Sequence, residues 1–482
     1  MAADSNHSYQ LVTALFLRLL GLIYLIAFAS IGVQIKGLVG SQGILPFSQE
    51  LLYLQGQMGI ERYFLVPNLF WLNASDVALT AAAMAGCAVS VLIILNRWSR
   101  LCLISAFILY LSLYTAGQLF SNFQWDGLLL EAGFLAIFLT PASRVVILLF
   151  RWLLFRLRFM SGLSKLTMQD PGWSGLTALN SYFEVQPLPT PLAWYAHQLP
   201  DWLLKTATAA TLIIEILVPL MMFLPRRWRF VAAWITIIWQ LLIMLTSNHN
   251  WFNILTIVLC LFLFDDKAIQ SILPQHLRTW LRRQPMPAAS GYRAEARRIM
   301  LVILATFILL ASSAQFWELA TMQHATGAIG RLVEYVEAYR VVNKYHVFPT
   351  MRSERIELQL SGSHDGREWK NYQFRYKPGD PGGRPAIVLP HQPRLDWEMW
   401  FVTQHPKYMH FFHSFLQALL NNSPAVTTLL RRNPFSDRPP RYIRVEAYKY
   451  RFSTPDERQK TGQWWQREAL GPFTPLPWLE RE

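Results

Sequence analysis

Long apolar segments recur along the chain and constrain its fold more than any other feature. They cover residues 19–33, 77–95, 101–120, 127–140, 206–224, 230–246, 252–264 and 299–314. A helix needs roughly 20 mainly apolar residues to cross about 30 Å of hydrocarbon. Some of these segments are shorter, but they lack the amphipathic periodicity that buried helices of a soluble core show. The sequence therefore predicts a polytopic α-helical membrane protein.

Basic residues predict how these segments are oriented. Charged residues make up only 15% of the chain, yet the net charge is +14. Basic clusters occur at 97–100, at Arg144, at 226–229 and across 265–298. If residues 144–164 form a further span, about nine spans result and every cluster falls on one side, which the positive-inside rule assigns to the cytoplasm. This placement accounts for the net charge without a nucleic-acid partner.

The same alternation assigns three regions to the exported side. The N-terminus is then cytoplasmic, and the loops 34–76 and 161–205 face outward together with everything after about residue 317. We therefore divide the chain into a helical transmembrane domain, 1–316, and an exported domain, 317–482.

The exported domain is predicted to be β-rich with helical insertions. Apolar and polar residues alternate in 355–363 and 369–377, with an Asp-Gly turn between them that favours a hairpin. A third candidate strand covers 441–453, and the aromatic-rich segment 405–420 is predicted to be a helix.

Cysteine and histidine usage excludes several kinds of chemistry. The three cysteines, Cys87, Cys102 and Cys260, all lie in apolar segments, so the exported domain has neither a disulfide nor a thiol redox motif. His410 and His413 have helical spacing, but no nearby carboxylate completes a ligand set. The sequence predicts no metal site and no cofactor.

Charged residues inside the apolar segments are the candidate membrane site. The segment WDGLLLEAGFLAIFLTP (125–141) carries Asp126 at its exported end and Glu131 at a depth of roughly 14 Å, nine residues from the cytoplasmic side. Such charges normally face a bundle interior and pair with each other. We expect Glu131 to pair with one of three arginines of the next span, which are Arg151, Arg156 and Arg158. Glu215 is a second deep carboxylate that could join this network.

Two interpretations of these charges remain open. They could be structural ion pairs, or they could line a polar cavity that opens outward. The cavity would include Asp126, Glu131, Lys165, Glu215, His249 and Asn253.

Aromatic residues and arginines of the exported domain also allow two explanations. They could form a contact surface for another protein, where such residues dominate the binding energy, or they could pack against the membrane domain. The candidate contact residues are Arg394, Trp397, Trp400, Trp464 and Trp465.

Seven colinear segments resemble the lipase maturation factor family. They include VQIKGLVGSQGILP (33–46), the 125–141 segment, SGLSKLTMQDPGWSGLTAL (161–179), PHQPRLDWEMWF (390–401) and RYIRVEAYKYRFS (441–453). The resemblance covers nearly the whole chain. It implies a membrane-resident folding factor whose exported domain engages secreted lipases, a lipase-type client as partner, and no catalysis of its own.

The segment GLSKL (162–166) is more distantly similar to the vitamin K-dependent γ-carboxylase. That resemblance implies an alternative in which Lys165 acts as the base of a membrane enzyme on a lipidic or quinone-like ligand. Where the carboxylase has a catalytic histidine, this sequence offers Gln124, Trp125 or Asp126, which favours shared ancestry over shared chemistry.

The cysteine-free exported domain and the lack of a KDEL-type signal indicate a bacterial inner membrane, with residues 317–482 in the periplasm. The endoplasmic reticulum membrane, with this domain in the lumen, is the alternative. The identity of the client and the oligomeric state stay open at this stage.

Overall fold

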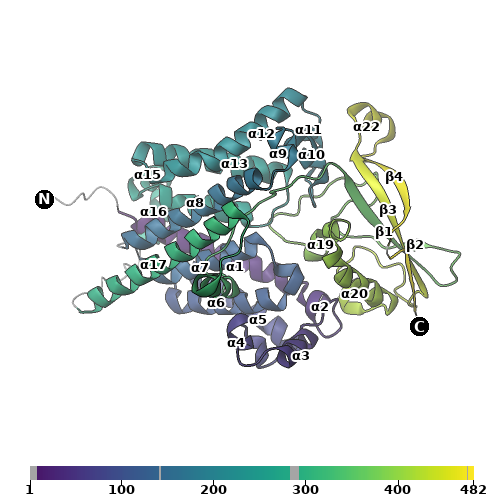
Figure 1. Ribbon diagram of the computed structural model, residues 1–482, viewed down its shortest axis with the longest axis horizontal. Coiled ribbons are helices and arrows are strands. Elements are labelled where there is room, and N and C mark those ends of the chain that lie inside the picture. The colour runs from purple at the N-terminus through teal and green to yellow at the C-terminus, as the bar shows by residue number, and fades with distance from the viewer. Residues whose placement is uncertain (1–7, 141–142, 283–291, 475, 482) are drawn as a thin grey trace.

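A computed structural model describes residues 8–140, 143–282, 292–474 and 476–481. The N-terminal two thirds is helical, and the C-terminal third contains a small sheet. Figure 1 shows the long helices on the left, the sheet on the right, and α19 and α20 between them. The long helices are α1 (Gln10–Gly32), α5 (Asp76–Ile94), α6 (Ser99–Ala116), α7 (Gln124–Phe138), α8 (Arg144–Thr167), α12 (Asp201–Ile216), α13 (Arg226–Thr246) and α17 (Tyr292–Thr321).

Six helices of the described residues are long and apolar enough to cross a membrane. They are Gln10–Gly32, Asp76–Ile94, Ser99–Ala116, Asp201–Phe223, Arg226–Thr246 and Glu295–Thr321. The prediction of a polytopic membrane protein with a C-terminal sheet is therefore confirmed, whereas the number nine is not. The other three predicted spans have identifiable reasons to differ. α7 has only 15 residues, α8 carries four arginines, and Phe252–Leu263 is a shorter apolar helix.

α7 lies at the centre of the helical part. It contacts α1, α6, α8 and α14 (Phe252–Leu259), and most of its residues are buried. Gly133 allows the close approach to α1, because a side chain there would overlap the Tyr24 hydroxyl. A polar group on α7 therefore faces protein and not lipid.

Short helices fill the two long loops of the helical part. The first loop contains α2 (Ile35–Val39), α3 (Phe47–Gln57) and α4 (Arg62–Leu65), and the second contains α9 (Pro171–Ser174), α10 (Ala178–Val185) and α11 (Pro191–His197). The remaining helices of this part are α15 (Asp266–Ile272) and α16 (Gln275–Arg282). Part of the predicted basic stretch 265–298 lies outside the described residues.

An extended segment joins the helical part to the sheet. After α17 the chain forms α18 (Gly327–Ala338) and then runs without regular structure to β1. We call residues 340–352 the linker.

The sheet is antiparallel, with strand order β2-β1-β3-β4 and β5 paired to β3. Its strands are β1 (Arg355–Ser363), β2 (Lys370–Asn371), β3 (Tyr442–Phe452), β4 (Trp465–Pro472) and β5 (Trp478–Glu480). The first and third predicted strands are confirmed. Inward-facing residues of β3 change from odd to even numbers after Ala447, where a bulge interrupts its pairing with β4.

Two predicted elements of this region need correction. The segment 369–377 pairs as a strand only at Lys370–Asn371, because Tyr376 and Lys377 donate their backbone N–H groups to the Asp396 carboxylate instead. The predicted helix 405–420 begins as α20 at Met409 and ends at Leu420. The other helices of the C-terminal third are α19 (Arg394–Val402), α21 (Pro424–Thr427) and α22 (Pro455–Thr461).

Candidate functional site

Asp126, one of two buried carboxylates of α7, is bound by an arginine of the C-terminal third. Arg394, the first residue of α19, donates from its two Nη atoms to the carboxylate at 2.9 and 2.8 Å. The Tyr110 hydroxyl donates to the same carboxylate at 2.5 Å. Burial acts to lower the pKa of Arg394, but the charge of Asp126 outweighs it and the pKa is raised. This bidentate pair fastens α19 to the first turn of α7.

Glu131, the second carboxylate, is paired with Arg156 of α8. The linker supplies the other donors, which are the backbone N–H of Asn343 at 3.0 Å, its side-chain amide at 3.1 Å and the Tyr345 hydroxyl at 2.8 Å. Arg156 also donates to the Asn343 carbonyl. All the expected hydrogen bonds of this carboxylate are therefore made inside the protein, as a stable buried ion pair requires.

Glu215 forms a third cluster, near the C-terminal end of α8. Lys165 Nζ lies 2.7 Å from Glu215 Oε2, and Arg158 Nη2 lies 3.5 Å from Oε1. The lysine also donates to the carbonyls of Val347 and Ser161, at 2.7 and 3.2 Å. Linker residues thus contact both the Glu131 and the Glu215 clusters.

A small cavity of about 70 Å³ lies beside Lys165, and we call it the lysine cavity. His249 and Asn253 also line it. In the described part of the chain, His249 Nε2 and Asn253 Oδ1 are buried without a hydrogen-bond partner. Burial lowers the pKa of His249 to about 4, so its imidazole is neutral at pH 7.

A cavity of about 670 Å³ adjoins the lysine cavity, and we call it the linker cavity. His249, Phe252, Val347, Phe348 and Met351 line both spaces. The wall of the linker cavity comes from the start of α7, the linker, α19 and the turn after it. Its aromatic lining consists of Tyr114, Phe123, Trp125, Phe252, Phe348, Trp397, Trp400, Phe401 and Tyr408.

Basic side chains complete the wall of the linker cavity. Lys344 is paired with Glu318 and Glu337, whereas Arg340, Arg352 and Lys407 form no ion pair with a described carboxylate. Aromatic walls beside unneutralised cations suit an amphipathic molecule with an apolar body and an anionic head. The linker cavity with the lysine cavity is therefore the candidate functional site of the helical part.

The predicted membrane residues separate into distinct groups in the structure. Lys165, Arg158, Glu215, His249 and Asn253 line the lysine cavity. Asp126 and Glu131 lie in separate ion-pair clusters, described above, and line neither space. Arg151 joins none of these clusters, because it donates to the Phe262 carbonyl and the Tyr9 hydroxyl.

The predicted contact residues mostly lie inside the protein. Arg394, Trp397, Trp464 and Trp465 are buried, so they do not form the exposed contact surface that the sequence suggested. Trp397 and the half-buried Trp400 line the linker cavity. Trp464 and Trp465 pack in a separate cluster with Trp194, Tyr450 and Phe452.

Sequence reasoning missed the linker. Asn343 and Tyr345 complete the Glu131 cluster, yet VVNKYHVFPT (341–350) has neither an apolar period nor a charge pattern that marks it. Gln124, which matches one candidate for the carboxylase histidine, exchanges two hydrogen bonds with the backbone of His346. Among the described residues no group of three or more histidine, cysteine and acidic side chains is placed to hold a metal ion.

Comparison with known proteins gives matches to both parts of the chain. A family model described as the lipase maturation factor transmembrane domain matches residues 11–271, and one described as the lipase maturation factor C-terminal domain matches residues 341–475. Lipase maturation factor 2 of Gallus gallus is 35% identical, with 96% of this chain and 80% of that protein covered.

Two further relatives show the same extent of similarity. Lipase maturation factor 2 of Homo sapiens is 32% identical over 97% of this chain and 82% of that protein. Lipase maturation factor 1 of Bos taurus is 32% identical over 97% of this chain and 89% of that protein. No solved structure gives a significant match.

Proposed function

The chain belongs to the lipase maturation factor family, and from this premise we propose that it is a membrane-resident folding factor for exported lipases or related hydrolases. The observation that carries the proposal is the extent of the similarity, since both the helical part and the C-terminal part match the family. The client binds the exported domain, and the chain itself catalyses no reaction.

We propose three further membrane segments in addition to the six apolar helices. α7, α8 and Phe252–Leu263 complete a set of about nine, with α7 and α8 enclosed by the others. The pairing of Glu131 with Arg156 supports this arrangement, because it removes two charges from contact with hydrocarbon. The domain boundary near residue 317 and the exported loops 34–76 and 161–205 belong to the same proposal.

The proposed location is a bacterial inner membrane with the C-terminal domain in the periplasm. Support comes from the confinement of all three cysteines to the apolar segments. The matched relatives are vertebrate proteins, so the endoplasmic reticulum is the alternative. A cysteine introduced at exposed Glu368 tests the sidedness: a membrane-impermeant maleimide should label it in intact cells, and labelling only after lysis contradicts the topology.

The function itself is tested by expressing a lipase with and without the chain. The expected result is a several-fold loss of lipase activity per molecule of lipase protein when the chain is absent, at an unchanged transcript level. The lipase should also co-purify with the full-length chain from gently extracted membranes. Equal specific activity in both strains contradicts the proposal.

An enzyme that uses Lys165 as a base is the second candidate, and the position of Lys165 in the wall of the lysine cavity favours it. A lipid or quinone would then occupy the linker cavity. Against this, Glu215 and two backbone carbonyls already bind the Lys165 amino group, so its polar contacts are made within the chain.

Lys165→Arg separates the two candidates, because it keeps the charge but cannot act as a base near pH 7. Lipase maturation should persist in this variant under the folding-factor proposal. Loss of function at a normal membrane level, with a stoichiometric lipid or quinone found by mass spectrometry, supports the enzyme instead.

A further inference from the structure

The C-terminal domain contains a large cavity that the sequence did not indicate. It has a volume of about 820 Å³ and lies between the sheet and the segment 371–386. We call it the arginine groove, because Arg375, Arg384, Arg431 and Arg467 all line it. Lys377 adds a fifth basic side chain, and the acidic lining residues are Glu357 and Asp380.

The acidic side chains do not neutralise the four arginines. Glu357 accepts from Arg355 at 2.6 Å and from Lys377 at 2.6 Å. Asp380 accepts locally from the backbone N–H of Gly382. In the described part of the chain, none of the four arginines forms an ion pair with a carboxylate.

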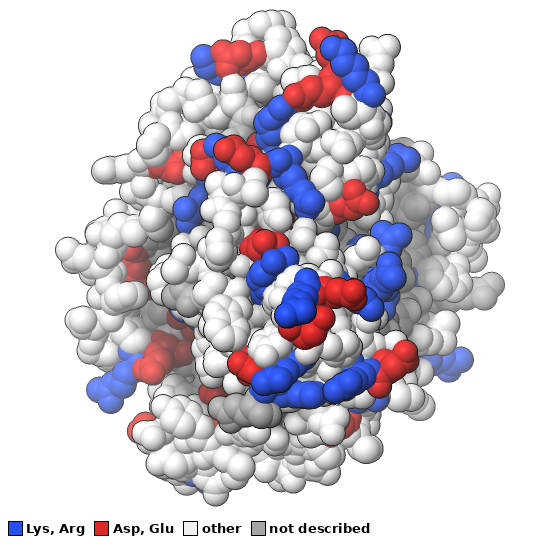
Figure 2. Space-filling model, turned by 90° about the vertical axis from the view of Figure 1, so that its right-hand side faces the viewer, with Lys and Arg blue, Asp and Glu red and all other residues white. Residues whose placement is uncertain are grey.

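Some arginines outside the groove do have a carboxylate partner. Arg444 and Arg451 of β3, and Arg441 directly before it, each lie within 3.4 Å of a carboxylate partner. Figure 2 shows basic and acidic side chains interspersed over the face on the sheet side. Other exposed arginines of this region, such as Arg432 and Arg438, also form no ion pair with a described residue. The groove differs from the surrounding surface because four unpaired arginines line one cavity.

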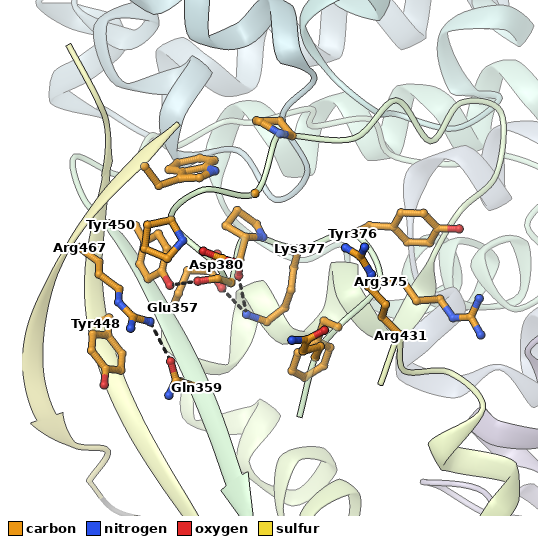
Figure 3. Close-up of a pocket in the computed structure, with 18 of the residues that line it drawn as sticks. Glu357, Gln359, Arg375, Tyr376, Lys377, Asp380, Arg431, Tyr448, Tyr450 and Arg467 are labelled. Atoms are coloured by element: carbon orange, nitrogen blue, oxygen red, sulfur yellow. Dashed lines mark hydrogen bonds and ion pairs between the residues drawn. The ribbon is translucent and has the colours of Figure 1, made fainter. Parts of the chain in front are cut away.

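The four arginines are held apart by different segments. Figure 3 shows Arg467 beside Tyr448 and Tyr450 on the sheet side, and Arg375 and Arg431 on the opposite side. Arg467 is fixed by its hydrogen bond to Gln359 at 2.8 Å and lies over the Tyr448 ring. Arg375 donates to the carbonyls of Thr428 and Leu429. Cations placed on two sides of a groove cannot all contact one small anion, but they can contact successive charges of an extended chain.

Aromatic side chains define the rest of the groove. Tyr448, Tyr450 and Trp465 belong to the strands of the sheet and line it, and the Tyr450 hydroxyl donates to the Gly379 carbonyl across it. Tyrosine, tryptophan and arginine are the residues that contribute most to protein–protein contacts.

We propose that the arginine groove binds an extended acidic segment of a protein client, with aspartate or glutamate side chains pairing with the arginines on its two sides. The assignment deepens the proposed function and rests on it for the identity of the client as a lipase-type protein. It does not use the five contact residues that the sequence suggested, except that Trp465 lies in the wall.

The test is binding of labelled peptides to the full-length chain in detergent micelles or nanodiscs, measured by fluorescence anisotropy. An acidic peptide with interspersed aromatic residues is compared with a peptide in which lysine replaces each acidic residue. The acidic peptide should bind and the basic one should not, with an affinity that falls as salt is added. Equal binding of both peptides overturns the proposal.

Variants locate the binding. The double variant Arg384→Glu, Arg431→Glu should lower the affinity for the acidic peptide by more than about tenfold, because it adds repulsion and removes attraction. Neither side chain makes a hydrogen bond or an ion pair to a described residue, so the double variant is expected to fold. Arg438→Glu, at an exposed arginine outside the groove, is the matched control and should bind as the wild type does. An unchanged affinity of the double variant overturns the proposal.

Competition identifies the chemical class of ligand. Inorganic phosphate and a sulfated oligosaccharide should fail to displace the peptide at equal concentrations of charge. If the oligosaccharide binds at the groove and the peptide does not, the occupant is a polyanionic glycan and the proposal is wrong.

The outcome is independent of the lipase experiment. If the peptide binds but the chain has no effect on lipase activity, the groove proposal is supported and the proposed function is contradicted. If the chain affects lipase activity but the peptide does not bind, the proposed function is supported and the groove proposal is contradicted.

Discussion

The two charged regions of the molecule, the centre of the helix bundle and the arginine groove, follow opposite rules. In the bundle, Asp126 and Glu131 are buried, and each has an arginine partner and further hydrogen-bond donors. In the groove, the arginines are exposed and have no carboxylate partner among the described residues. The bundle charges are already satisfied within the chain, so their role is to hold it together. The groove charges remain free to bind another molecule.

This contrast gives a test of each region by substitution. Removing one member of a paired, buried set leaves the other member desolvated and unpaired, which costs stability. Removing an exposed arginine costs little stability but changes binding.

The largest expected effect is that of Arg394→Ala. It leaves the Asp126 carboxylate buried beside Tyr110 without its cation, and we expect a loss of about 3–5 kcal/mol in the free energy of unfolding. The midpoint of thermal or denaturant unfolding in micelles measures it, with Arg438→Ala as the control. Equal midpoints for the two variants would show that the Asp126–Arg394 pair does not stabilise the packing of α19 on α7.

Tyr345→Phe should have a smaller effect. It removes one hydrogen bond to the Glu131 carboxylate and keeps the ring in place, so we expect a loss of about 1.5–3 kcal/mol. Tyr339→Phe is the matched control, because no described residue forms a hydrogen bond with that hydroxyl. The same unfolding assay applies. If Tyr339→Phe is as unstable as Tyr345→Phe, the hydrogen bond from the linker to Glu131 makes no specific contribution to stability.

Acidification should lower the stability of the protein by protonating the Glu357 carboxylate. Burial acts to raise the pKa of this carboxyl, but Lys377 and Arg355 outweigh it, and the pKa is lowered from the ordinary value of 4.5. A lowered folded-state pKa gives stability that is complete above pH 4.5 and is lost as pH falls through the folded-state value. Unfolding midpoints between pH 7 and pH 3 should fall less steeply for Glu357→Gln than for the wild type, and parallel curves would exclude this residue as the source.

The smallest effect on stability should be that of Arg431→Glu. Surface substitutions of this kind change the free energy of unfolding by about 0.5 kcal/mol or less. A loss as large as that of Arg394→Ala would mean that Arg431 is structural, and the contrast between the two regions would disappear.

The sequence predicts that the N-terminal part is a polytopic membrane domain, because hydropathy is a local signal. It also limits the partner of Glu131 to three arginines, but only the packing of α7 on α8 selects Arg156. The pairing of Asp126 with Arg394 joins residues 268 positions apart. Periodicity and spacing carry no information about such a contact, so the sequence alone places Asp126 in the membrane site and Arg394 in the contact surface.

In the C-terminal domain, the alternation of apolar and polar residues predicts strands but not the contacts between segments. Alternation identifies β1 and β3, yet it cannot show that Glu357 is buried, because its neutralisation depends on Arg355 and Lys377. The strand predicted at 369–377 ends early because Asp396 captures its backbone N–H groups. That departure from the sheet makes the segment 371–386 one wall of the arginine groove, so the groove could not be predicted from strand patterns.

The most direct test of the account is the specific activity of a co-expressed lipase in three otherwise identical strains. The strains carry the wild-type chain, the Arg384→Glu and Arg431→Glu double variant at the same membrane level, or no chain. We predict high lipase activity per lipase molecule with the wild type, and a value near that of the empty strain with the double variant. The same specific activity in all three strains would contradict both the family-based function and the role of the groove.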